Sequence, residues 1–117
     1  MRIDPDSFLG GYLECALWTA EDNDATIFDF DPDTLAEAQS LCDQFQAENA
    51  EALERYYEKT DRTDPSAGHD LWLTRNGHGV GFWDRIAGDE FPELCDAAKA
   101  LGECYVFLDD DGVPGIE

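Results

Sequence analysis

Apolar residues near the start of the chain recur at the spacing of one helical face. The recurrence begins after Asp4-Pro5, a pair typical of a helix start, and ends at Trp18. Gly10 and Gly11 interrupt it, and each costs a helix up to about 1 kcal/mol relative to alanine. We therefore expect a helix that packs closely against a neighbouring element, where larger side chains would not fit. The apolar positions are Phe8, Leu9, Tyr12, Leu13, Ala16 and Leu17.

The clearest pattern of the chain follows Asp31-Pro32-Asp33. An apolar stripe at helical spacing continues over about seven turns, until the polar stretch 60–68 ends it. The opposite face is rich in glutamate. The pattern predicts one long amphipathic helix, preceded by a short extended piece at 25–30. The stripe consists of Leu35, Ala38, Leu41, Cys42, Phe45, Asn49, Ala52, Leu53 and Tyr56.

Two short segments around Asn76-Gly77 have the composition of paired strands. They cover 70–75 and 80–85, and both are rich in large apolar residues. Asn-Gly is the strongest short-range hairpin signal, because a type I′ turn needs positive φ at both central positions. We therefore expect a β-hairpin over 70–85.

The last third of the chain predicts one more helix and one more strand. The helix is expected at about 91–101 with Gly102 as its stop, and the strand at 103–108 before a turn at 109–112. Together the elements predict an α+β fold. Its three helices, one of them long, pack on a small antiparallel sheet built around the hairpin.

Length and composition limit the chain to one modest hydrophobic core. With 117 residues, 43% of them hydrophobic, it predicts a single domain over 1–117. No apolar run approaches the roughly 18–20 residues that cross a bilayer, and the start lacks the order of a signal peptide, so we expect a cytoplasmic protein. Cysteines without Cys-x-x-Cys spacing are expected to be buried thiols, not disulfides. They are Cys15, Cys42, Cys95 and Cys104.

The formal net charge of −21 is unevenly distributed along the chain. Fourteen Asp and Glu lie between Asp4 and Glu54 without a single Lys or Arg, whereas six of the seven basic residues lie between Arg55 and Lys99. Such a surface repels nucleic acid and anionic membranes and attracts basic protein surfaces. We therefore expect a basic protein surface as the partner, and no direct contact with nucleic acid or membrane.

A row of glutamates makes the most specific candidate for a binding site. Steps of three, four and seven residues along a helix separate carboxylates by about 4.5–10 Å, the same order of magnitude as the phosphate spacing of about 3.4 Å along a nucleic-acid strand. Like charges this close destabilise a helix by a few tenths of a kcal/mol per pair, so a binding role would explain why they are kept. The predicted partner-binding residues are Asp22, Asp24, Asp29, Asp31, Asp33, Glu37, Glu48, Glu51, Glu54 and Glu58.

Other constellations favour structural roles. His69, Asp70, His78 and Asp84 lie near the expected hairpin, but two histidines, one at a turn tip, do not define a metal geometry. The Asp-x-Asp-x-Asp run at 29–33 resembles the opening of a calcium loop without its glycine and closing glutamate. No Ser or Cys has the flanking pattern of a nucleophile. We expect no catalytic residue, no metal and no cofactor, and hence no enzyme.

A seventeen-residue block resembles a set of small acidic proteins encoded by bacteriophages and other mobile elements. The block is His-Asp-Leu-Trp-Leu-Thr-Arg-Asn-Gly-His-Gly-Val-Gly-Phe-Trp-Asp-Arg, at 69–85. The similarity extends to Gly-Tyr-Leu-Glu-Cys-Ala-Leu-Trp at 11–18, to Ala-Ala-Lys-Ala-Leu-Gly-Glu at 97–103 and to the closing Asp-Asp-Gly, and it departs at Ile86-Ala87. The resemblance implies a phage or mobile-element origin and brings no catalytic residues with it.

Charge and resemblance together suggest an anti-defence protein. As a DNA mimic it would bind a nucleic-acid-binding host effector, as an anti-CRISPR or anti-restriction inhibitor does. The alternative is a small non-enzymatic adaptor that binds a phage or host protein through the hairpin face, with Arg75, His78 and Arg85. Acidity also suits a high-salt cytoplasm or solubility alone, and the sequence leaves these readings open.

Overall fold

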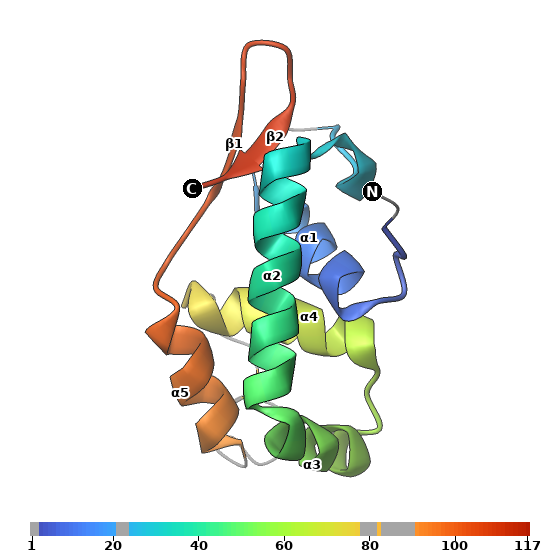
Figure 1. Cartoon of the computed structure of the whole chain (residues 1–117), viewed down its shortest axis with the longest axis vertical. Coiled ribbons are helices and arrows are strands. Elements are labelled where there is room, and N and C mark those ends of the chain that lie inside the picture. The colour runs from blue at the N-terminus through green and yellow to red at the C-terminus, as the bar shows by residue number, and fades with distance from the viewer. Residues whose placement is uncertain (1–2, 21–23, 78–81, 83–90) are drawn as a thin grey trace.

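The computed structural model describes residues 3–20, 24–77, 82 and 91–117, and helices form most of it. The α+β prediction was wrong. Within the described residues five α-helices pack on one another, and the strands found there form a two-stranded hairpin at the C-terminal end (Figure 1). In chain order the elements are α1 (Phe8–Thr19), the 3-10 helix η1 (Ile27–Asp29), α2 (Pro32–Glu48), α3 (Ala50–Thr60), α4 (Asp64–Arg75), α5 (Pro92–Ala100), β1 (Val106–Leu108) and β2 (Pro114–Ile116).

The first predicted helix is confirmed as α1, and so is the reason for its glycines. The Ser7 hydroxyl caps the helix by accepting the N–H of Gly10 at 3.0 Å. A Cβ on Gly11 would lie 2.0 Å from the carbonyl oxygen of Pro65 in α4. On the α4 side, a Cβ on Gly68 would lie 2.1 Å from the carbonyl oxygen of Phe8. The two helices therefore cross at backbone contact, which only glycine permits.

Side chains reinforce the crossing of α1 and α4. The rings of Tyr12 and Trp72 meet edge to face with centroids 5.3 Å apart. The Trp72 indole donates to the Thr19 hydroxyl at 2.9 Å, and the Arg75 guanidinium donates to the Tyr12 hydroxyl at 2.8 Å. These partly buried polar groups are hydrogen-bonded to one another, and the bonds determine which face of α4 is turned toward α1.

The first strand of the predicted hairpin, at 70–75, is helical and belongs to α4. The buried positions Ala67, Leu71 and Thr74 follow helical spacing. The Asn-Gly pair ends this helix instead of turning a hairpin. Its glycine, Gly77, adopts φ +67°, the left-handed conformation that commonly follows a helix C-terminus.

The second predicted strand, at 80–85, lies outside the described residues except for Phe82. That residue is buried, and its N–H donates to the Thr74 hydroxyl at 3.0 Å. Of the residues that the adaptor hypothesis needs, His78 and Arg85 also lie outside the described residues. Arg75 lies in α4, and its guanidinium donates to the backbone carbonyls of Gly102 and Leu101 as well as to Tyr12.

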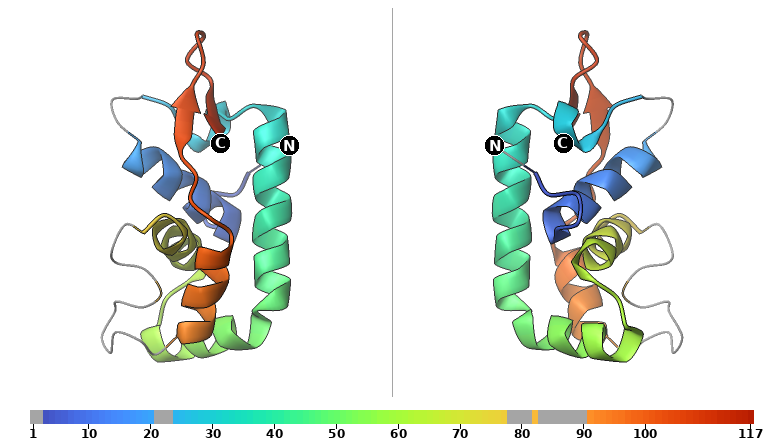
Figure 2. Two further views of the ribbon diagram at one scale, coloured as in Figure 1. Left: turned by 90° about the vertical axis from the view of Figure 1, so that its left-hand side faces the viewer. Right: turned by 90° about the vertical axis from the view of Figure 1, so that its right-hand side faces the viewer.

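The predicted long helix is two helices, because the chain breaks at Asn49. The side-chain amide of Asn49 donates to the Phe45 carbonyl at 2.9 Å, and its own backbone N–H donates to the same oxygen at 3.0 Å. With φ −121° and ψ 24°, Asn49 departs from helical geometry and turns the chain. As a result, α2 runs along one whole side of the molecule and α3 crosses its base (Figures 1 and 2).

A chain of aromatic rings joins these helices into one core. Phe8 of α1 lies 6.1 Å from Phe45 of α2, whose ring stacks on Phe82 at 5.9 Å. Tyr56 of α3 meets both Phe82 and Phe91 edge to face at 5.4 Å. The buried apolar residues form a single cluster around them. No helix in the described part of the chain is long and apolar enough to cross a membrane.

The helix predicted near the C-terminus is confirmed as α5. It stops before Gly102, which adopts φ +82°. The strand expected at 103–108 is present as the three residues of β1, but its antiparallel partner β2 was not predicted. The Asp109 carboxylate shapes the connecting turn by accepting the N–H groups of Asp111 and Val113 at 2.8 and 2.9 Å.

Candidate functional site

The carboxylates nearest the start of α2 have local structural roles. Asp31 caps the helix by accepting the N–H of Thr34 at 2.9 Å and its hydroxyl at 2.7 Å. These hydrogen bonds to the charged form lower the pKa of the Asp31 carboxyl below its usual range. Asp29 accepts the backbone N–H of Thr26 at 2.8 Å in a capping box that closes η1. Asp24 is exposed before η1, and Asp22 lies outside the described residues.

The outer face of α2 carries the first acidic row. Asp33, Glu37 and Glu48 are exposed and lie within about 60° of one another around the helix axis, at 3.6 residues per turn. They extend over about 22 Å of helix at 1.5 Å per residue. Gln44 lies between them on the same face, and its amide approaches the Glu48 carboxylate at 3.4 Å. The buried side of α2 faces the other way.

The outer face of α3 carries the second and denser row. Glu51, Glu54 and Glu58 are exposed, again within about 60° around the axis, with axial steps of about 4.5 and 6 Å. The buried positions Ala52 and Tyr56 lie on the opposite side. This spacing is closer to that of a row of phosphates than the spacing of the row on α2.

The two rows meet at the bend between α2 and α3. Glu48, the last residue of α2, and Glu51, in the first turn of α3, line one shallow hollow of about 560 Å³. Glu93 of α5 lines the same hollow and pairs with Arg55 in the ion pair found among the described residues. Six of the ten predicted carboxylates thus lie in two exposed rows, one on each helix, that adjoin at this hollow. We call these six the acidic ridge: Asp33, Glu37, Glu48, Glu51, Glu54 and Glu58.

Positive charge is sparse along the acidic ridge. Helix α2 contains no Lys or Arg. Helix α3 contains Arg55, which is paired with Glu93. It also contains Lys59 in its last turn, where a positive charge interacts favourably with the helix dipole. Arg55 lines the hollow that Glu48 and Glu51 line, and Arg75 lines another hollow together with Glu37, so basic side chains lie near part of the ridge.

Of the other residues considered as candidates, His78 and Asp84 lie outside the described residues, and several of the rest are buried. Asp70 is fully buried and accepts a hydrogen bond from the Tyr56 hydroxyl. Burial, with a contribution from the nearby Asp70 carboxylate, raises the pKa of the Cys15 thiol to about 12. Burial also raises the pKa of the Cys42 thiol, and both thiols are protonated at neutral pH. Of the four cysteines, Cys104 alone is less than fully buried, and all four are free thiols.

No group of three or more His, Cys, Asp or Glu side chains that could hold a metal ion occurs among the described residues.

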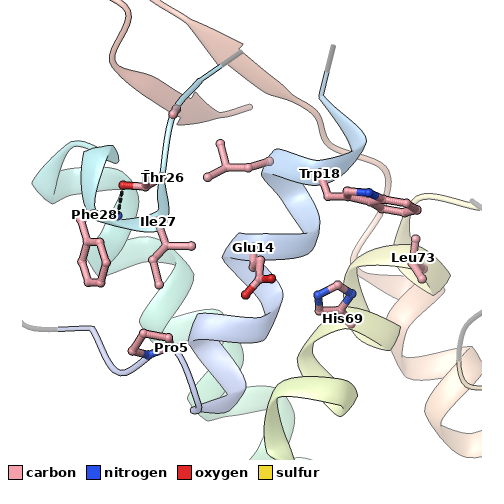
Figure 3. A pocket seen from close by; sticks show the side chains of 10 residues that line it. Pro5, Glu14, Trp18, Thr26, Ile27, Phe28, His69 and Leu73 are labelled. Atoms are coloured by element: carbon pink, nitrogen blue, oxygen red, sulfur yellow. Dashed lines mark hydrogen bonds between the residues drawn. The ribbon is translucent and has the colours of Figure 1, made fainter. Parts of the chain in front are cut away.

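His69 stands on α4 beside an apolar groove that the sequence did not reveal. The groove has a volume of about 840 Å³ and lies between α1, η1 and α4 (Figure 3). Trp18 was interpreted only as the end of a helix, but it is 75% exposed at the edge of this groove. In the sequence, Trp18 simply ends an apolar helical pattern, and that pattern gave no sign that its side chain would be exposed.

Comparisons with family models, with curated proteins and with solved structures give no match for this chain.

Proposed function

We propose that this chain is a non-enzymatic inhibitor from a bacteriophage or mobile element, and that its acidic ridge occupies the basic nucleic-acid-binding surface of a host defence protein of CRISPR or restriction type. The partner would be a protein in the host cytoplasm. The ridge stands in for part of a phosphate backbone, and the aromatic core holds it in place. No metal or cofactor takes part.

The observation that carries this proposal is the outward alignment of carboxylates on two adjoining helices. Glu51, Glu54 and Glu58 repel one another at i, i+3 and i+7 on α3, at a cost of a few tenths of a kcal/mol for each adjacent pair. The cost is offset when a basic surface neutralises them. A nucleic-acid-binding groove is such a surface, because its lysines and arginines are placed to meet repeated negative charge.

Salt should weaken the proposed complex strongly. A charged interface formed at the protein surface is screened over about 8–10 Å at physiological ionic strength. Contacts to six to ten DNA phosphates lose about 10³–10⁵ in affinity between 50 and 200 mM salt. The ridge has fewer charges at wider spacing than DNA. We therefore expect a smaller but clear loss, of about tenfold or more over the same range.

The test is capture of host proteins on the immobilised chain at about 50 and about 200 mM salt. The wild type should retain a nucleic-acid-binding protein at the lower concentration and release it at the higher one. A ridge variant in which four carboxylates become amides should not retain it, because the shape is kept while the charge is lost. The substitutions are Glu48→Gln, Glu51→Gln, Glu54→Gln and Glu58→Gln.

A matched control removes the same number of charges from exposed positions outside the ridge. This control variant should behave as the wild type if the ridge is the contact, since its net charge equals that of the ridge variant. Equal loss in both variants, or capture that does not change with salt, would refute the proposal. The control substitutions are Asp96→Asn, Glu103→Gln, Asp110→Asn and Asp111→Asn.

A further inference from the structure

The groove between α1, η1 and α4 is built from two pairs of side chains on crossing helices. Glu14 and Trp18 stand one turn apart on α1, and His69 and Leu73 stand one turn apart on α4. Figure 3 shows Glu14 beside His69 and Trp18 beside Leu73. The backbone contact between the two helices fixes these pairs relative to each other. The groove is therefore a preformed feature of the fold.

One end of the groove is apolar and the other is polar. Leu17, Ile27 and Leu73 line the apolar end together with the aromatic rings of Trp18 and Phe28. At the polar end, a second hollow of about 300 Å³ shares Pro5, Glu14 and His69 with the groove and continues it. Asp6, Arg62 and Ser66 line this continuation.

Two large aromatic side chains, on opposite sides of the groove in Figure 3, are exposed to solvent. Trp18 is 75% exposed and Phe28 is 63% exposed, although the neighbouring residues Leu17 and Ile27 are buried. Exposed apolar patches of this kind mark sites that bind proteins, membranes or small ligands. Tryptophan is also among the residues that most often dominate binding energy at interfaces.

Charge limits what can occupy this groove. The chain carries a net charge of −21, so a second copy of itself or an anionic membrane would be repelled. Glu14 lines the groove from α1, and Asp6 adds a second carboxylate at the polar end, which Arg62 and His69 also line. A segment with a positive charge matches this end, and a large apolar side chain matches the other.

We propose that the groove binds a polypeptide segment of a partner protein that presents one or two large apolar side chains and, within a few residues of them, a Lys or Arg. The apolar side chains pack between Trp18, Phe28 and Leu73, and the basic residue pairs with Glu14. The binding mode is that of a short segment laid across two helices. This inference does not depend on the acidic ridge, which lies on α2 and α3.

The test is selection of peptides from a displayed random library on the folded wild-type chain. The enriched peptides should combine large apolar residues with a nearby Lys or Arg. Trp18→Ala should weaken their binding by about tenfold or more, as expected for a tryptophan that becomes buried in an interface. Glu14→Lys should remove the preference for the basic residue and leave the apolar preference in place. Both substituted side chains are exposed, so folding should survive.

Tyr105 supplies the matched control. It is 59% exposed but lies outside the groove, so Tyr105→Ala should leave peptide binding unchanged. The proposal is overturned if no peptide is enriched over a Trp18→Ala, Phe28→Ala double variant, or if enriched peptides bind the variants and the wild type equally. It is also overturned if sedimentation shows a dimer of the free chain that Trp18→Ala dissolves, because the groove would then hold a second copy. If the wild type binds the selected peptides but captures no host protein through the acidic ridge, only the proposed function is refuted.

Discussion

Replacing Gly11 by alanine tests the packing of α1 against α4, on which the groove depends. In an exposed helix this change would be favourable, because alanine is a better helix former than glycine by about 1 kcal/mol. At Gly11, however, the new Cβ would lie 2.0 Å from the Pro65 carbonyl oxygen and 2.6 Å from its carbonyl carbon. Both atoms belong to the backbone of α4, so no side chain can rotate to make room.

The two effects have opposite signs, and their magnitudes decide the outcome. Added bulk in a packed interior costs typically about 1–3 kcal/mol, and a clash with backbone should reach the upper end of that range. After the gain of about 1 kcal/mol in helix propensity, a net loss of about 2 kcal/mol remains for Gly11→Ala. A loss of this size is a substantial part of the stability of a small domain.

Urea unfolding followed by circular dichroism measures the loss as a lower midpoint with an unchanged slope. The control is Ala36→Gly on the exposed face of α2, where the same pair of residues is exchanged without any packing change. It should cost about 1 kcal/mol from propensity alone. If Gly11→Ala were neutral or stabilising, α1 and α4 would not cross at backbone contact, and the groove would not have the walls described above.

Three further predictions concern single groups. Asp31→Ala should lower the free energy of unfolding by about 1 kcal/mol at pH 7. Because the pKa of the Asp31 carboxyl is lowered in the folded chain, the difference in stability from the wild type should shrink as the pH falls below about 4. A difference that grew at low pH would contradict the capping role. Only the Cys104 thiol should react quickly with a thiol reagent in the folded chain, and rapid reaction of more than one thiol would contradict the burial of the others. Replacing Glu54 and Glu58 by glutamine should raise the free energy of unfolding by about 0.3 kcal/mol, since one repulsive i, i+4 pair is removed while Glu51 keeps its favourable place in the first turn of α3. A lower stability would mean that these two glutamates stabilise α3.

Local signals in the sequence predicted several elements correctly. Helical spacing located α1 and α5, and the glycines of α1 indicated a close approach before any neighbour was known. The stripe from Leu35 to Tyr56 also placed the glutamates on the outer face. That part of the prediction survives the break at Asn49, since each of the two helices keeps its own apolar side toward the core.

The errors came from signals with two physical meanings. Asn-Gly can turn a hairpin or end a helix, because both need a residue with positive φ, and at Gly77 it ends α4. Asn49 fits a helical stripe by position, yet its side chain bonds the Phe45 carbonyl and closes α2 instead. The groove depends on how α1 crosses α4, which is a tertiary property. The exposure of Trp18 therefore could not be read from the spacing of apolar residues.

The most direct test of the acidic ridge is competition with nucleic acid for the captured partner. The partner is bound to a labelled duplex, and the chain is titrated in while the anisotropy of the label is followed. Mutually exclusive binding is predicted, with complete release of the duplex by the wild type, weaker release as salt rises, and no release by the ridge variant. A stable complex that contains the partner, the duplex and this chain together would contradict the account.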